Sequence, residues 1–292
     1  MNPSSSAKFP LTHIAAIVAA LCALLALISG ALATTATTLT PPVSSEIVST
    51  GGHAHTGEYL GVVLILMLIL TALKESGVRV LALALAAMVL LEGFPGPQAV
   101  PGAANAMGLL HAVLAQVLLA GTVAVAILTA PSWKRPPEHV GDYGWPSLRS
   151  LAVLLPVLVL TQVVLGAGFR QRISGLMPHI IGAMLVALLI LIVCAFTLQQ
   201  CPTHTILRAA AKTLMVATFA QIFLGIAAYT VRAIGPNADA NAVLAFTGGH
   251  VAVGALTLAA SIVLSMQIRR NVLPKYRAGC HPARRLARKR GW

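Results

Sequence analysis

Acidic side chains are scarce in this sequence. The 292 residues include seven Asp and Glu against twenty Lys and Arg, and only 9% of the chain is charged, whereas 58% is hydrophobic. An average soluble globular domain has about 25% charged residues. This composition excludes an ordinary soluble domain and predicts an integral membrane protein.

Cysteine is equally rare, with four in the whole chain. Cys22 and Cys194 fall inside apolar runs, Cys201 and Cys280 fall outside them on the side that is predicted below to be cytoplasmic, and no two are arranged as C-x-x-C. A structural disulfide framework is therefore not expected.

Long apolar runs are abundant. A helix that rises about 1.5 Å per residue needs about 20 residues to cross a hydrocarbon core of about 30 Å. Eight runs approach or exceed that length, and we predict an all-α protein with eight spans at 12–34, 57–74, 78–94, 106–130, 149–170, 175–198, 206–229 and 246–268. The run 12–34 is longer than the apolar core of a signal peptide, so it is interpreted as a span.

The excess of basic residues is a topology signal. If the chain crosses the membrane eight times, every Lys and Arg except Arg170, Arg172 and Arg232 falls on the side that carries both termini. The positive-inside rule therefore predicts cytoplasmic termini, and the basic charge does not imply a nucleic-acid partner. Residues 131–148 are expected to form a cytoplasmic connector and 269–292 a solvated basic cytoplasmic tail, with contact to anionic lipid or a partner as the less favoured alternative.

Histidine recurs at the start of every second predicted span. The spans then form four outward-and-return hairpins, each with a histidine where the chain turns back into the membrane. These residues are His53, His111, His179 and His250. The first and last hairpins correspond closely, because Gly-Gly-His-x-x-x-Gly occurs at 51–57 and again at 248–254. That register favours His53, and His55 on another helix face remains an alternative.

Four imidazoles at one depth in a helix bundle suit a bound cofactor. A catalytic zinc would need three close ligands, and this side of the membrane offers no Cys and, as acids, only Glu46, Glu58, Glu92 and Asp239. Two facing helices that each contribute one imidazole fit bis-histidine haem, so the sequence predicts two haems. Glycines beside the histidines would let a flat ring approach the backbone. They are Gly52, Gly57, Gly182, Gly249 and Gly254.

These features resemble the heme A synthase family, eight-helix membrane enzymes of cytochrome oxidase assembly built from two four-helix halves. The likeness extends over about 12–268 and is carried by the four histidines, by TQVVLGAGFRQRISGLMPH at 161–179 and by AQIFLGIAAYTVR at 220–232. The resemblance implies that His53 or His55, with His111, ligates the substrate heme O in an N-terminal half, 1–130. It also implies that His179 and His250 hold an electron-relaying haem b in a C-terminal half, 149–268.

The family typically has Glu-x-x-His-Arg at the first histidine, whereas here Thr50 lies three residues before His53. Glu58 follows His55 by three residues and shares its helix face, and Glu92 lies at the outer end of the third span, so both are candidate catalytic acids. Glu46, in the first outer loop, is a further candidate. Arg170, Arg172 and Arg232 are candidate partners of the haem propionates.

The function expected from the resemblance is oxidation of heme O to heme A in a bacterial-type inner membrane. Expected partners are heme O, lipid, heme O synthase, cytochrome oxidase or a quinone, and a homo-oligomer is compatible with the sequence. Because the family motif is changed, two alternatives stay open. One is a non-enzymatic dihaem electron-transfer or assembly subunit, and the other is a helical scaffold whose histidines only form hydrogen bonds.

Overall fold

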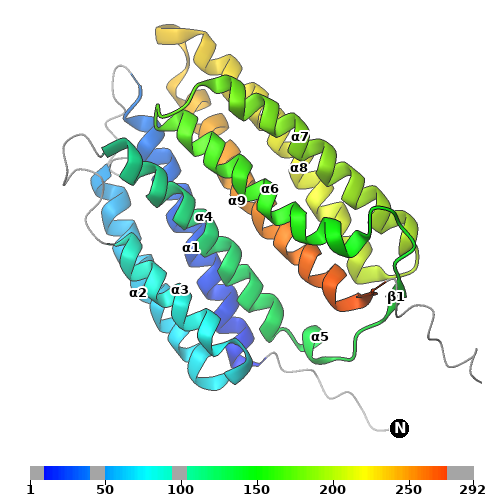
Figure 1. Ribbon diagram of the computed structural model, residues 1–292. Coiled ribbons are helices and arrows are strands. Elements are labelled where there is room, and N and C mark those ends of the chain that lie inside the picture. The colour runs from blue at the N-terminus through cyan, green and yellow to red at the C-terminus, as the bar shows by residue number, and fades with distance from the viewer. Residues whose placement is uncertain (1–9, 40–49, 94–103, 275–292) are drawn as a thin grey trace, which may run out of the picture.

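The computed structural model describes residues 10–39, 50–93 and 104–274, which are mostly helical (Figure 1). The helices are α1 (Leu11–Ala36), α2 (Thr50–Lys74), α3 (Arg79–Glu92), α4 (Ala104–Thr129), α5 (Pro131–Lys134), α6 (Leu148–Arg170), α7 (Leu176–Gln200), α8 (Thr205–Ala233) and α9 (Ala240–Asn271). Two 3-10 turns, η2 (Ser76–Val78) and η4 (Gly235–Asn237), and two strands, β1 (Val140–Gly141) and β2 (Val272–Leu273), are the other elements.

Seven helices of the described part of the chain are long and apolar enough to cross a membrane: α1, α2, α4, α6, α7, α8 and α9. Large apolar side chains such as Leu66, Met184 and Phe223 are exposed on their outer faces. A soluble fold would rarely expose so much contiguous apolar surface. The chain is therefore an all-α, multi-pass membrane protein. Helix α3 has 14 residues, or about 21 Å, so an eighth span remains a prediction.

Side-chain caps determine where several helices begin. Helix α9 starts at Ala240, six residues before the predicted span, because the Asp239 carboxylate accepts hydrogen bonds from the N–H groups of Asn241 and Ala242 at 3.2 and 3.3 Å. Ser147 caps α6 in the same manner, and the buried His204 caps α8 through Nδ1. Such caps satisfy backbone donors that the helix itself leaves unpaired.

Helices α1 to α4 pack as a ring in which each contacts the next and α4 contacts α1, and α6 to α9 pack in the same way. Helix α9 also contacts α1 and α4, so it lies where the two rings meet. Figure 1 shows the long helices running roughly parallel, with α5 and β1 at one end. We call this the basic end, because Lys74, Lys134, Arg149 and Arg269 lie there.

Two sets of polar contacts hold the chain segments together at the basic end. The buried Asp142 carboxylate accepts hydrogen bonds from the N–H groups of Leu148 and Arg149 at 3.2 and 3.3 Å. Nearby, β1 and β2 pair in parallel, with Val140 opposite Val272. The connector between α5 and α6 is thereby held against the end of α9.

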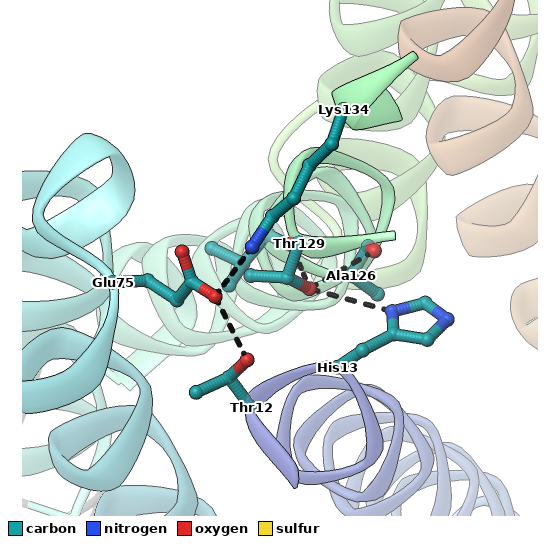
Figure 2. Close-up of polar contacts among 7 residues, drawn as sticks. Thr12, His13, Glu75, Ala126, Thr129 and Lys134 are labelled. Atoms are coloured by element: carbon teal, nitrogen blue, oxygen red, sulfur yellow. Dashed lines mark hydrogen bonds and ion pairs between the residues drawn. The ribbon is translucent and has the colours of Figure 1, made fainter. Parts of the chain in front are cut away.

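Glu75 lies at the centre of the second set of contacts (Figure 2). Its Oε1 accepts from Lys134 Nζ at 2.8 Å and from Thr12 Oγ1 at 3.0 Å, while His13 Nδ1 lies 3.4 Å from Thr129 Oγ1. The bond from Lys134 lowers the pKa of Glu75. These contacts join the basic ends of α1, α2, α4 and α5.

Candidate functional site

The four predicted histidines form two pairs. The ring centroids of His53 and His111 are 6.2 Å apart with the planes at 70°. Those of His179 and His250 are also 6.2 Å apart, with the planes at 90°. Each pair brings together helices that are not consecutive along the chain, α2 with α4 and α7 with α9. All four residues lie within the first eleven residues of their helices, toward the end of the bundle opposite the basic end.

Three of the imidazole rings lie against a glycine of the preceding long helix. A Cβ added at Gly30, Gly166 or Gly225 would lie 2.9 Å from Cε1 of His53, His179 or His250, respectively. Only glycine, which has no Cβ, leaves room for the imidazole rings in their present positions. None of these three glycines is among those that the sequence predicted to lie beside a ring.

The His53–His111 pair has an anionic partner. Glu92, the last residue of α3, places Oε2 2.7 Å from His111 Nδ1, and its side chain is only 11% exposed. The second oxygen, Oε1, is buried and has no hydrogen-bond partner. On the other ring, His53 Nδ1 lies 3.2 Å from Ser29 Oγ. Both contacts involve Nδ1, which leaves Nε2 as the nitrogen for a metal.

The His179–His250 pair is surrounded by glutamine. Gln162 and Gln221 each precede the contact glycine by four residues, so Gln-x-x-x-Gly occurs in both α6 and α8. Gln162 Nε2 lies 2.8 Å from His179 Nδ1, and Gln221 Nε2 lies 3.3 Å from His250 Nε2. His250 Nδ1 lies 3.2 Å from the carbonyl oxygen of Gln221.

Two of the predicted glycines make room for these glutamines. A Cβ at Gly182 would clash with Gln162, and one at Gly254 would lie 3.0 Å from Gln221 Nε2. At Gly57 the space is open, with nothing within 4 Å. Gly182 and Gly254 therefore accommodate glutamines of the preceding helices, whereas Gly30, Gly166 and Gly225 accommodate the rings.

Two of the three predicted arginines lie near the C-terminal pair. Arg170 follows Gly166 by four residues, about 6 Å along the helix, and donates to the Ala31 carbonyl oxygen at 2.7 Å and to Thr35 at 3.1 Å. Arg232 donates to Thr247, one turn before His250, at 3.2 Å. Arg172 is exposed in the turn between α6 and α7, away from these contacts.

The remaining candidates are not brought to the pairs. His55 and Glu58 are both exposed on α2, and His55 is rotated by about 200° from His53 around the helix axis. Glu46 lies outside the described residues. Of the predicted acids, Glu92 is the one that the structure places in contact with a paired histidine.

The separation of the rings in each pair agrees with that of two imidazoles bound to one iron. Two imidazoles that hold one metal from opposite sides, each nitrogen at about 2 Å, have their ring centroids about 6 Å apart. Both measured separations, 6.2 Å, agree with that value. Within residues 10–39, 50–93 and 104–274, no group of three or more His, Cys, Asp or Glu is arranged to hold a metal ion. A bis-histidine haem takes two nitrogen ligands from its protein. In the N-terminal pair both Nε2 atoms are available, whereas in the C-terminal pair His250 Nε2 lies against the Gln221 amide, which would have to move aside.

No known family profile matches this chain, and no curated protein sequence matches it. The interpretation of the site therefore depends on the residues and on their geometry.

Proposed function

We propose that this chain is a dihaem membrane oxidoreductase that converts heme O to heme A for cytochrome oxidase assembly. The observation that supports the proposal most directly is the two histidine pairs at 6.2 Å, three of whose rings lie against glycine. The pair of His53 and His111 is assigned to substrate heme O, and the pair of His179 and His250 to a resident haem b. Haem supplies the redox chemistry, and the chain supplies binding, orientation and charge.

The two assignments are implied by the resemblance to the heme A synthase family, and the charges around the pairs support them. Haem propionates are anionic, and Arg170 and Arg232 lie within two turns of the C-terminal pair, where guanidinium groups can hold them. A permanent haem is expected where these charges are matched. The N-terminal pair instead has Glu92, whose carboxylate holds the proton of His111 Nδ1 and so directs Nε2 toward the substrate iron.

Oxidation of a methyl group to a formyl group takes one oxygen atom from water and releases four protons and four electrons. It therefore requires an electron acceptor, for which a quinone or another haem protein is the proposed partner. Substrate transfer from heme O synthase and product transfer to cytochrome oxidase are further proposed contacts. Glu92 Oε1, which is buried without a partner, is the group available to accept a proton near the substrate haem.

The proposed topology has eight spans in two four-helix halves, with α3 as the short eighth span. The two rings of contacting helices, α1 to α4 and α6 to α9, support this arrangement. The cations at the basic end support a cytoplasmic location for that end and for both termini in a bacterial-type inner membrane. The histidine pairs would then lie toward the outer face.

A second candidate function is a non-enzymatic dihaem electron-transfer or assembly subunit. It is favoured by one specific observation: His55 and Glu58, which together could replace the family's Glu-x-x-His, are both exposed on α2 and are not part of a histidine pair. In this case both pairs would hold resident haem and no substrate would be converted.

The deciding experiment is to express the chain in a host that makes heme O but lacks its own heme A synthase. Bound haems are extracted and identified by chromatography and mass. Recovery of heme A or its alcohol intermediate is expected, and recovery of only haem b or heme O would favour the non-enzymatic function. A colourless protein from haem-replete cells would refute both functions and leave a scaffold with hydrogen-bonded histidines.

A further inference from the structure

A groove of about 590 Å³ opens at the basic end, where the two helix rings meet. It is formed by α4, α5, α6 and α9, and its wall includes Leu128, Trp133, Val153, Pro156, Ile262 and Arg269. Arg269 and Ile262 lie seven residues apart on α9. The groove therefore extends about 10 Å along this helix toward the membrane interior. Its inner part is apolar, and its mouth is basic.

The cations at the mouth have only neutral partners. Arg270 lies 4.4 Å from the centre of the Trp133 ring and donates hydrogen bonds to the carbonyl oxygens of Trp133, at 2.7 Å, and Arg135. Arg269 is exposed, and its own carbonyl oxygen accepts from Arg149 at 2.7 Å. In the described part of the chain the ion pairs are His111–Glu92 and Lys134–Glu75, so no carboxylate offsets these arginines.

We propose that this groove binds an anionic phospholipid, with the phosphate at Arg269 and Arg270 and one acyl chain against Leu128, Val153 and Ile262. Uncompensated guanidinium groups next to an apolar channel complement both parts of such a lipid. Basic pockets between membrane helices are a known location for acidic lipid headgroups. Trp133 is also the residue type that favours the headgroup level of a membrane.

The position of the groove gives the lipid a structural role. Its walls come from α4 and α5 on one side and from α6 and α9 on the other, and α4 and α6 contact one another only sparsely compared with α4 and α9. A bound acyl chain fills the space between these helices. The lipid thus joins the two helix rings at the basic end, far from the histidine pairs.

The test uses the full chain, purified in mild detergent from membranes that contain phosphatidylethanolamine, phosphatidylglycerol and cardiolipin. Retained phospholipids are measured per chain by mass spectrometry. We expect about one anionic phospholipid per wild-type chain, enriched at least fivefold over its share of the membrane. Val153→Trp fills the apolar part of the groove and Arg269→Ala removes a cation, and each should lower this retention at least fivefold.

The matched control is Lys212→Ala, which removes an exposed cation of α8 near the same end but outside the groove. It should retain lipid as the wild type does. Helical circular dichroism and size-exclusion profiles establish folding, and Arg269→Ala alone decides the result if Val153→Trp does not fold. Unchanged lipid in Arg269→Ala, equal retention of phosphatidylethanolamine, or recovery of a quinone in place of phospholipid would each overturn the proposal.

Discussion

The two histidine pairs share their spacing and differ in their surroundings. Both have ring centroids 6.2 Å apart, and glycine contacts a ring in each. Around the C-terminal pair, Gln162 and Gln221 occupy equivalent positions on α6 and α8. In α1 the equivalent position, four residues before Gly30, is Ala26, and a carboxylate approaches the pair from α3 instead.

This difference indicates which features belong to the scaffold and which belong to each site. The glycine contact and the ring separation occur in both pairs, so they are the features on which the proposed binding of haem depends at either site. Neutral amides and nearby arginines at one site, and a buried acid at the other, make the two sites electrostatically distinct. The predictions below test the shared geometry first and the distinct charges afterwards.

Removal of a paired histidine should have the largest effect. We expect His250→Ala and His53→Ala each to lower the haem content to about half of the wild-type value, because each removes an axial ligand from one of two sites. Haem is quantified per chain by its absorbance after extraction into pyridine. His55→Ala, which removes an exposed imidazole two residues from His53, should retain full content. An equal loss of haem in His55→Ala would show that the pairing of the histidine rings does not identify the ligands of the haem iron.

Enlargement of a contact glycine should reproduce much of that loss while the histidine is retained. A methyl group at Gly225 would lie 2.9 Å from the His250 ring, which is tightly packed there. Gly225→Val should therefore displace the imidazole and weaken haem retention at the C-terminal pair at least tenfold in a dilution assay. Gly57→Val is the matched control, because nothing lies within 4 Å of a Cβ at that position. If the two variants behave alike, the ring contact has no functional importance.

The long helices and the identity of the paired histidines could be predicted from the sequence, because both depend on local patterns. Apolar runs locate the long helices, and the Gly-Gly-His repeat distinguishes His53 from His55 by register. The contact between Glu92 and His111 could not be predicted in this way, because it depends on how far α3 rotates and where it ends relative to α4. The contact of Arg170 with α1 is similar, since it joins residues 139 positions apart.

Glu92 provides the sharpest test of the difference between the pairs. If His111 ligates haem iron as proposed, a charged hydrogen bond to it would stabilise the oxidised iron by about 1.4 kcal/mol, which corresponds to about 60 mV for one electron. Glu92→Gln should therefore raise the midpoint potential of the N-terminal haem by about 60 mV and leave the other haem unchanged. Potentiometric titration followed by visible absorbance resolves the two haems. Glu58→Gln, which alters an exposed acid of α2, should shift neither potential.

The smallest expected effect lies at the basic end, where the helices around the N-terminal pair are joined by the ion pair of Glu75 and Lys134. The hydrogen bond from Lys134 lowers the pKa of Glu75 from an ordinary value of 4.5. A lowered carboxyl pKa stabilises the folded state above about pH 4.5, and this stabilisation is lost as the pH falls through the folded-state pKa.

Glu75→Gln should accordingly lower the melting temperature by a few degrees at pH 7, since a partly exposed ion pair contributes about 1 kcal/mol or less. The difference from the wild type should narrow below pH 4.5, where the unfolded carboxyl is already protonated. Thermal unfolding followed by circular dichroism at pH 3.5 to 7 measures this. Glu138→Gln, which alters an exposed acid of the connector, should match the wild type throughout. A Glu75→Gln difference that does not change with pH would show that the side chain acts by packing rather than by charge.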